Sequence, residues 1–468
     1  MKTFLFSILV FIYGTVCAQD SLKVISLSEY LGYVKAFHPI VKQANLIISE
    51  SEAKLLKARG AFDPKLEIDY DTKRFKSTDY YNKLNTTFKI PTWYGIELKG
   101  TFEENDGIFL NPESTIPEDG LYSVGVSVSV ARGLLTNERM AFLRQSKLYV
   151  KQAKAERQLQ VNNILYQATL SYFKWLQTYN EKRLFENFLN NAQMRFDGIK
   201  KSYEVGELSA IDTTEAKMAL NNRKLSLEKA RIKFIKSSLE LSNYLWINDN
   251  TPIELKDGVI PDVNTLENID DALHITGMLM ENINVNDHPK IQSLDYKLQS
   301  LTIEKRLQAN NLLPKVDLQY NFLTQTPEII SSMNTSAYKS GINISFPLFL
   351  RKERGDLKLA KFKIQDTRFE IESTKVILKN KIDALFQELR SFLTQNKFIE
   401  DLVADTNTLL KAEERKYFLG ESSLFLVNSR ESKLLDTQLK SIAIETEFFN
   451  TKALLFNVLS ISQDTPIY

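Results

Sequence analysis

The sequence predicts a mixed α+β protein built from two structural repeats, and three observations lead to this fold class. The first is a stretch from about Thr136 to Gly206 that contains no proline and one internal glycine, Gly198. The second is a set of short segments in which apolar and polar residues alternate. The third is that the second half of the chain repeats the order of the first at nearly constant offsets.

The proline-free stretch is expected to be one long helix. Its apolar residues recur three or four positions apart, as in Val161, Leu165, Ala168 and Tyr172, which is the spacing of a helical stripe. At about 1.5 Å per residue such a helix is roughly 100 Å long, several times an ordinary globular helix. A helix of this length has to lie beside others like it, in a coiled coil or a cylinder of helices.

The charges of the chain are balanced, with 60 Lys and Arg residues against 58 Asp and Glu residues. A nucleic-acid-binding protein would carry a basic excess, so we expect no nucleic-acid partner. The sequence has no nucleophile elbow, no phosphate-binding glycine loop and no zinc-binding His-Glu-x-x-His motif. We therefore expect neither an enzyme nor a bound cofactor or metal.

The N-terminus has the pattern of a signal peptide that covers residues 1–18. Lys2 precedes an apolar run, and Val16-Cys17-Ala18 fits the small-residue cleavage site. A lipoprotein with lipidated Cys17 is the alternative, although Val16 is bulky for the position before a lipidated cysteine. Cys17 is the only cysteine, so the mature chain would have no disulfide. We expect an exported protein whose membrane-spanning part, if any, is made of strands.

The two repeats match each other position by position. The expected parts are the signal peptide 1–18, the first repeat 19–247, a connecting segment 248–286, the second repeat 287–460 and a C-terminal tail 461–468. The repeats open on His38-Pro39 and His288-Pro289, which lie 250 positions apart. Because the residue before a proline disfavours helix, each dipeptide is expected to separate a short helix from a longer one. A catalytic or metal-binding role for the two histidines is the less favoured alternative.

The alternating segments are expected to be strands of a membrane barrel. They cover residues 65–74, 121–131, 315–323 and 338–348. Each has about the length of a tilted transmembrane strand, and a row of apolar residues opposite a row of polar ones suits a barrel with a wet lumen. An ordinary sheet with one solvated face shows the same alternation. The signal peptide and the long helices favour the barrel.

The first repeat holds an additional alternating hairpin at residues 85–102. Gly341 lies 216 positions after Gly125, so the first repeat carries 34 more residues than the second. They include Asn85–Ile90 and Tyr94–Phe102, which are joined at a Pro-Thr-Trp turn. Either the hairpin adds two strands to the barrel, with Trp93 and Tyr94 at the inner interface of the membrane that the barrel spans, or it forms an external or lumenal flap. Asn85–Ile90 is short for a span, so both alternatives stay open.

Each repeat ends in two long helices joined by a glycine turn. The expected helices cover residues 136–203 and 209–247 in the first repeat, and 352–418 and 423–460 in the second. The turns read YEVGELS around Gly206 and YFLGESS around Gly420. Glycine supplies a left-handed turn and the following serine caps the returning helix.

These features resemble the TolC-like outer-membrane efflux proteins: the signal peptide, the doubled helix–strand–strand–helix–helix unit, the His-Pro starts and the glycine turns. The resemblance implies a homotrimer whose subunits share one β-barrel in the outer-membrane lipid, above a periplasmic tunnel of helices. It implies a passive exit duct of a tripartite efflux or type I secretion system, with a periplasmic adaptor and an inner-membrane pump as partners. That family uses four barrel strands per subunit, so the hairpin at 85–102 is a departure. A coiled-coil scaffold or adhesin of the cell envelope is the alternative function.

The resemblance also implies a periplasmic gate at the helical tips. By position from the turn glycine, the acidic candidates are Asp212 and Glu215, which would form anionic rings in a trimer. The alternative is that both are first-turn acids that the helix dipole favours. In the second repeat Leu424, Phe425 and Leu426 stand in this region, and they suggest an apolar constriction or a docking surface.

The turns themselves are the candidates for contact with the adaptor. They comprise Gly206, Glu207, Leu208, Ser209, Gly420, Glu421, Ser422 and Ser423. The alternative is that they are only favourable turns. Three basic residues near the second turn, Arg415, Lys416 and Arg430, are possible ion-pair partners of Asp212 across the tip.

Overall fold

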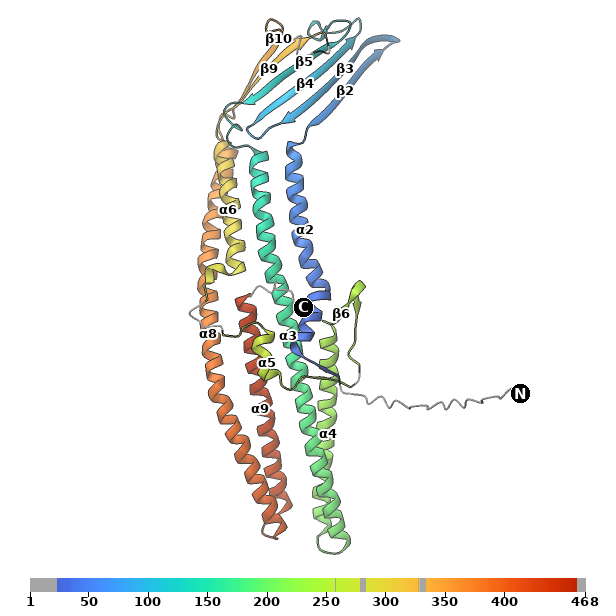
Figure 1. Ribbon diagram of the computed structural model, residues 1–468, viewed down its shortest axis with the longest axis vertical. Helices are drawn as coiled ribbons and strands as arrows, with labels where there is room; N and C mark the ends of the chain where they lie inside the picture. The colour runs from blue at the N-terminus through green and yellow to red at the C-terminus, as the bar shows by residue number, and fades with distance from the viewer. Residues whose placement is uncertain (1–22, 257, 278–282, 327, 329–333, 461–468) are drawn as a thin grey trace, which may run out of the picture.

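The computed structural model of the protein describes residues 23–256, 258–277, 283–326, 328 and 334–460. The expected signal peptide with Cys17 and the expected tail 461–468 lie outside the described residues. The molecule is elongated, with a sheet at one end, long helices running away from it and two helical hairpins at the other end (Figure 1). The predicted mixed α+β fold with long helices is confirmed.

Two of the shorter helices are capped by the histidines of the His-Pro dipeptides. The shorter helices are α1 (Leu27–Phe37), α2 (Pro39–Arg59), α5 (Thr265–Ala272) and α6 (Pro289–Asn310). Nδ1 of His38 accepts a hydrogen bond of 3.2 Å from the backbone N–H of Ile40, and Nδ1 of His288 accepts one of 3.1 Å from Lys290. Each proline then occupies the first helical position, where its missing N–H breaks no hydrogen bond.

Four long helices form the shaft and the tips. They are α3 (Glu138–Glu204), α4 (Ala210–Ser242), α8 (Arg351–Phe418) and α9 (Leu424–Leu459). In the half near the sheet the side-by-side order is α2, α3, α6, α8, and in the half near the tips it is α4, α3, α9, α8 (Figure 1). The helix expected over 209–247 ends earlier, at Ser242, because Trp246–Ile247 pair as β6 with β7 (Thr251–Pro252).

The sheet has six antiparallel strands in the order β10-β9-β5-β4-β3-β2. They are β2 (Lys65–Phe75), β3 (Thr78–Pro91), β4 (Ile96–Asp106), β5 (Leu121–Ser129), β9 (Lys315–Thr324) and β10 (Tyr338–Ser345). Residues that pair directly across antiparallel strands point to the same face. One row across all six strands is therefore apolar, and it reads Leu66, Phe88, Gly100, Val124, Phe322, Tyr338.

The neighbouring row is polar, and it reads Lys65, Lys89, Lys99, Gly125, Asn321, Lys339. Because the register keeps this separation from edge to edge, the sheet has one apolar face and one hydrophilic face. Lysines that stand directly opposite each other repel, and Lys89 in the middle of this row is compensated by an ion pair with Glu67 on the same face.

The additional hairpin is part of this sheet and not a flap beside it. β3 and β4 lie between β2 and β5, and β3 has 14 residues against the six expected from Asn85–Ile90. The strand starts at Thr78, where polar and aromatic residues conceal the alternation in the sequence. Phe88 and Ile96 both lie on the apolar face, as the barrel interpretation of the hairpin requires.

The main core lies halfway along the shaft, around Trp175. This side chain is fully buried, with Tyr172 and Phe173 beside it on α3 and Phe456 from α9. At this level β1 (Lys23–Ile25) pairs in parallel with β8 (Val259–Pro261) of the connecting segment, which also contains α5. Short 3-10 turns lie at Gly60–Phe62, Pro112–Ser114, Asn248–Asn250 and Val285–Asp287.

No helix in the described part of the chain is both long enough and apolar enough to cross a membrane.

Candidate functional site: the helical tips and the lateral edges

The two tips turn in the same way. Gly206 and Gly420 have φ angles of 81° and 78°, in the left-handed region that side chains other than glycine disfavour. The backbone N–H groups of Glu207 and Glu421 each donate a hydrogen bond of 2.9 Å to the carbonyl oxygen five residues earlier. Both turns are helix C-caps of the Schellman type, so glycine is required at these positions by the backbone angle.

The Asp212 side chain caps the N-terminus of α4. Its Oδ2 accepts hydrogen bonds from the backbone N–H of Ser209 at 3.1 Å and from the Ser209 hydroxyl at 2.7 Å. This is the side-chain cap that stabilises a helix N-terminus. Arg430, an expected partner of Asp212, pairs instead with Glu413 at 3.5 Å. The pKa of Glu413 is lowered, mainly because the Ser422 hydroxyl donates a 2.6 Å hydrogen bond to its carboxylate. Arg430 lowers the pKa further, by a smaller amount.

Glu431 links the two hairpins, and its carboxylate is almost fully buried. Its Oε1 lies 3.1 Å from Nη2 of Arg195 on α3, and its Oε2 lies 3.3 Å from Nη2 of Arg223 on α4. Arg195 also reaches Glu414 on α8 at 3.2 Å. The three residues Arg195, Arg223 and Glu431 are called the tip triad below. The triad connects α3, α4 and α9, and through Glu414 it also reaches α8.

Glu215 joins this network from α4. Its Oε1 accepts a 3.5 Å hydrogen bond from the Asn428 amide, whose oxygen accepts one of 3.3 Å from Arg195. The tip triad was not predicted from the sequence. The one available signal was that Glu431 follows Val427 and precedes Leu434 on the apolar stripe of α9, where a carboxylate needs a cationic partner.

Leu424 lies inside the tip. It is buried against Ile199 and Ala216, so its side chain belongs to the packing between the hairpins. Phe425 and Leu426 on the next positions are exposed, 67% and 40% of their area. Of the three apolar candidates, only these two present their side chains to the surroundings of the chain.

The lateral edges of the chain carry apolar side chains that nothing covers. The helix α4 exposes one stripe at a spacing of seven residues: Ile211, Met218, Leu225, Ile232 and Leu239. A seven-residue repeat is the pattern of a helix that packs along another helix. On the opposite edge, α8 exposes Phe362, Phe369 and Val376 near the sheet, and Leu402 and Leu409 near the tip.

The sheet has open edges on the same two sides. All 11 residues of β2 and all 8 of β10 are exposed, and each strand pairs with one neighbour only. One lateral edge of the molecule thus consists of β2, α2 and α4, and the other consists of β10 and α8 (Figure 1). Long unpaired strands with one apolar face are templates for pairing with another chain.

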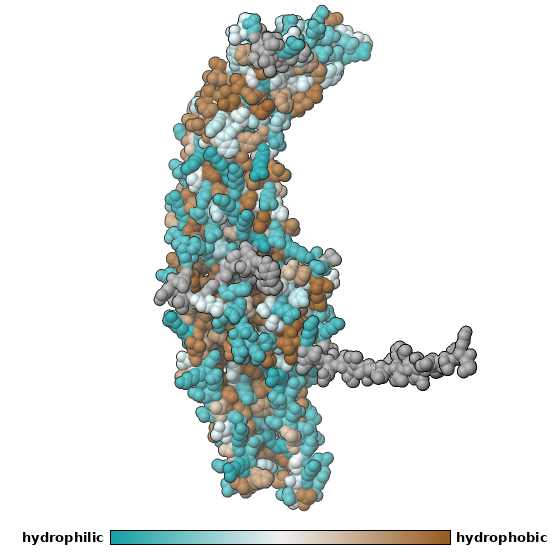
Figure 2. Space-filling view, in the orientation of Figure 1, coloured by the Kyte–Doolittle hydropathy of each residue, from teal (hydrophilic) through white to brown (hydrophobic). Residues whose placement is uncertain are grey.

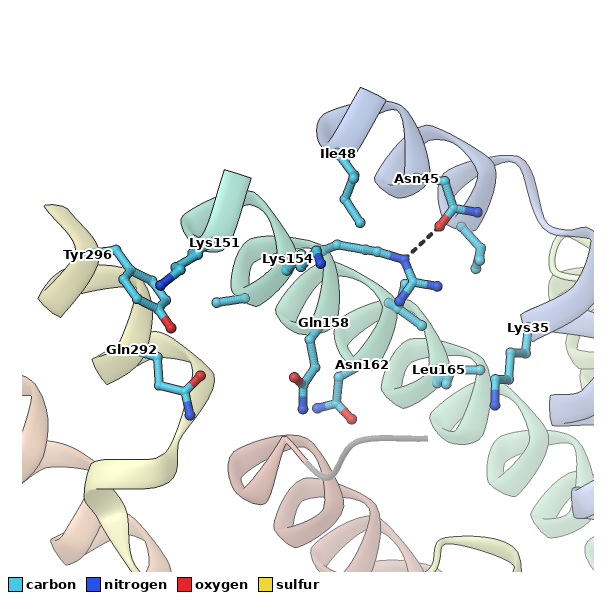
Figure 3. Close-up of a pocket in the computed structure, with 14 residues that line it drawn as sticks. Lys35, Asn45, Ile48, Lys151, Lys154, Gln158, Asn162, Leu165, Gln292 and Tyr296 are labelled. Carbon is cyan, nitrogen blue, oxygen red and sulfur yellow. Dashed lines mark hydrogen bonds between the residues drawn. The ribbon is translucent and has the colours of Figure 1, made fainter. Parts of the chain in front are cut away.

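A basic groove lies on α3 between α2 and α6, with a volume of about 640 Å³. Lys35, Lys151, Lys154 and Arg157 line it, and no carboxylate is among the described residues of its wall (Figure 3). The Arg157 Nε donates a 2.6 Å hydrogen bond to Asn45. Such a groove attracts anions. No group of three or more His, Cys, Asp or Glu side chains among the described residues is placed to hold a metal ion.

No protein-family model and no curated protein sequence matches the chain. Solved structures do match in fold. The CmeC outer membrane channel of Campylobacter jejuni is 13% identical with a TM-score of 0.64, over 94% of this chain and 87% of that chain. The VceC outer membrane protein of Vibrio cholerae is 13% identical at 0.65, over 93% and 96%. The open state of the Neisseria gonorrhoeae MtrE outer membrane channel is 11% identical at 0.66, over 93% and 88%. The chain therefore has the fold of these outer membrane channels, as the resemblance predicts.

Proposed function

We propose that this chain, which has the fold of the TolC-like outer membrane channels, is one subunit of a homotrimeric exit duct in the cell outer membrane. The duct conducts solutes passively in a tripartite efflux or type I secretion system. The proposal rests on the uncovered lateral edges of the chain: the outer strands β2 and β10 are exposed, and α4 and α8 expose apolar side chains. The matching edges of neighbouring copies would complete them.

The sheet edges are compatible with closure. Six antiparallel strands per chain is an even number, so β2 of one copy runs antiparallel to β10 of the next. Their apolar rows then continue each other, and the closed barrel has an apolar outer face for lipid and a hydrophilic lining. Closure also removes the two exposed strand edges.

The helical edges are complementary as well. The stripe on α4 would pack on Leu402 and Leu409 of α8 from the next copy, and α2 would pack on Phe362 and Phe369 of the same helix. Repetition of one such contact around a three-fold axis gives a closed ring of subunits. The helices then form a periplasmic tunnel below the barrel.

A belt of apolar and aromatic side chains at the base of the sheet would mark the periplasmic boundary of the outer membrane (Figure 2). Trp93 stacks on Phe62 with 5.6 Å between ring centroids, and the following residue, Tyr94, is exposed. Phe346 and Phe349, between β10 and α8, are exposed as well. Aromatic rings prefer this boundary between hydrocarbon and water. The proposed position of Trp93 and Tyr94 agrees with their location in the β3–β4 turn.

At the other end, the tips would close the tunnel and dock on the periplasmic adaptor of an inner-membrane pump. The tip triad would be the contact that holds the two hairpins of each subunit in the closed arrangement. Asp212 and Glu215 would each occur three times around the axis, together with the exposed Phe425 and Leu426. The turn residues around Gly206 and Gly420 are the proposed adaptor contacts.

Assembly is tested with Leu225→Glu, which places a charge in the middle of the exposed α4 stripe. We expect this variant to lose the trimer, measured by light scattering in detergent, while circular dichroism of the helices is retained. Lys224→Glu is the control, because its side chain is exposed beside the stripe. A Leu225→Glu protein that assembles as well as the control would contradict the proposed interface.

Conduction is tested in planar bilayers with the purified full-length protein. Wild type is expected to insert and to stay mostly closed, with a larger conductance when Glu431→Ala releases the tip triad. A folded trimer that never conducts, in wild type or in this variant, would favour the scaffold or adhesin alternative.

A further inference from the structure

We infer that each subunit binds an anionic glycerophospholipid on the outer side of α3, at the level where the helices meet the sheet. The site is a cavity of about 630 Å³ between α3 and α6, called the α3–α6 cavity below. This inference rests on the proposed duct, because the duct is what places this level of the chain at the periplasmic leaflet of the outer membrane.

The α3–α6 cavity combines a basic part with an apolar part. Its cations come from both helices and are Arg144, Lys147, Lys151 and Arg306. Its apolar side chains are Met140, Ala141, Leu148 and Ile303. No carboxylate is among the described residues of its wall. A phospholipid offers both a phosphate for the cations and hydrocarbon for the apolar side chains, whereas an inorganic anion offers only the charge.

The positive charge of α3 is concentrated on this side of the helix. Residues 138–157 contain six Lys and Arg residues but only two acids, Glu138 and Glu156. Glu138 lines a separate cavity on the hydrophilic face of the sheet. Glu156 accepts hydrogen bonds from Gln152 at 2.8 Å and from Ser293 at 3.2 Å. Neither acid lines the α3–α6 cavity, so the cations there have no carboxylate of α3 beside them in its wall.

The cavity faces away from the proposed lumen. Arg139 pairs at 2.7 Å with Glu97, which lies on the hydrophilic face of the sheet. Arg144 follows five residues later, which is a rotation of about 140° around an α-helix. The side of α3 that carries Arg144 and the cavity is therefore turned away from the face that would line the duct.

Trp93 gives the level of the cavity relative to the membrane. The guanidinium carbon of Arg144 lies 5.4 Å from the centre of the Trp93 ring, which in turn stacks on Phe62. Tryptophan rings at a membrane boundary lie at the depth of the lipid headgroups. A cation in contact with this ring is placed to meet the phosphates of the same leaflet.

The geometry indicates how the lipid would be held. Its phosphate lies between Arg144, Lys147 and Arg306, whose side chains are all exposed. An arginine guanidinium can donate two parallel hydrogen bonds to one phosphate, which makes this contact both strong and directional. Lys151 also lines the basic groove farther along α3, so a lipid with two phosphates would extend into that groove.

The test measures which lipid contacts Trp93. The full-length protein is reconstituted into vesicles of phosphatidylcholine and phosphatidylglycerol, in which the acyl chains of either one lipid or the other carry bromine. Bromine quenches tryptophan fluorescence on contact, so the ratio of the two quenching levels gives the relative affinity of the two lipids. The variant Trp93→Phe gives the background from Trp175 in the main core and Trp246 in β6, far from the sheet (Figure 1).

We expect phosphatidylglycerol to be preferred at Trp93 by at least roughly fivefold, the factor that one basic residue contributes near a membrane surface. Combining Arg144→Gln, Lys147→Gln and Arg306→Gln should remove the preference. Lys305→Gln is the matched control, because this exposed neighbour does not line the cavity, and it should keep the preference. Each ratio is measured within one protein, so a change in the fluorescence of Trp93 itself cancels.

Three results would overturn the inference and leave the duct intact. The first is equal quenching of Trp93 by the two lipids in wild type. The second is a preference that the triple variant retains, since the anionic lipid would then lie elsewhere. The third is a preference that excess inorganic phosphate removes at constant ionic strength, because the cavity would then take free phosphate. If neither brominated lipid quenches Trp93, this level of the chain is not in a membrane, and the proposed duct itself fails.

Discussion

The two ends of the molecule are held together in different ways. At the sheet end, backbone hydrogen bonds connect all six strands, and their register separates an apolar face from a hydrophilic one. At the tip end, the two hairpins meet through two small apolar clusters, around Leu424 and around Phe188 and Val427, and through the tip triad. A backbone ladder fixes the width of a barrel, whereas a few side-chain contacts can be released. In the proposed duct, this difference would give a permanent opening at the sheet end and a movable closure at the tips.

The largest effect is expected when the tip triad loses its carboxylate. Glu431→Ala leaves Arg195 and Arg223 close together without their buried carboxylate partner. Removal of one member of a buried ion pair lowers the stability of a protein by about 3–5 kcal/mol. Hydrogen exchange should increase in α9 near the tip and stay unchanged in β5. Combining Glu431→Met with Arg195→Met and Arg223→Leu should recover most of the loss, because an apolar replacement leaves no charge buried. Unchanged exchange at the tip of Glu431→Ala would show that the hairpins do not depend on the triad.

The next effect distinguishes two neighbouring apolar residues at the tip, one buried and one exposed. Leu424→Ala removes a buried side chain and should destabilise the tip by about 2–5 kcal/mol. Phe425→Ala removes an exposed side chain and should change the stability of the subunit by less than about 0.5 kcal/mol. Thermal unfolding in detergent measures both, with Phe425→Ala as the matched control. Equal losses would mean that Phe425 is covered in the assembled protein.

A smaller effect is expected at the turn glycines. Gly206→Ala and Gly420→Ala force a side chain into the left-handed region and should each cost about 1–2 kcal/mol. Gly198→Ala is the control, since this glycine lies inside α3 and a Cβ added there would meet no other atom within 4 Å. That change should stabilise the helix by up to about 1 kcal/mol. If all three substitutions have the same sign, the backbone angle is not what selects glycine at the turns.

The smallest effect concerns pH and the helix caps. Burial lowers the pKa of His288, and that of His38, below the ordinary value of 6.5, so both imidazoles are neutral caps in the folded chain. Their contribution to stability is complete above the unfolded pKa and is lost as pH falls below it, because the unfolded chain then binds the protons. The slope is at most about 1.4 kcal/mol per pH unit for each group.

The variant His288→Asn separates the cap from the titration. Asparagine is also a good helix cap but does not titrate. We expect a flatter loss of thermal stability between pH 6.5 and acidic pH than in wild type. A variant with an unaltered pH profile would assign the acid sensitivity to other groups.

Much of the architecture could be predicted from the amino-acid sequence, because the signals are local. The proline-free stripe after Thr136 predicts a helix that any compact domain would be too small to hold. The alternation in β2, β5, β9 and β10 predicts strands and their faces, since side chains in a strand alternate with a period of two. The glycine turns and the His-Pro starts were visible for the same reason.

The tertiary structure decided what depends on distant contacts. The first half of β3 is polar, and only its pairing with β2 and β4 makes it a strand. The contact between Arg195 and Glu431 joins residues 236 positions apart, and no local spacing encodes it. Leu424 and Phe425 are neighbours with the same apolar character, yet the packing of one hairpin on the other buries only the first. Local periodicity follows from backbone geometry, whereas burial and ion pairing follow from which elements meet.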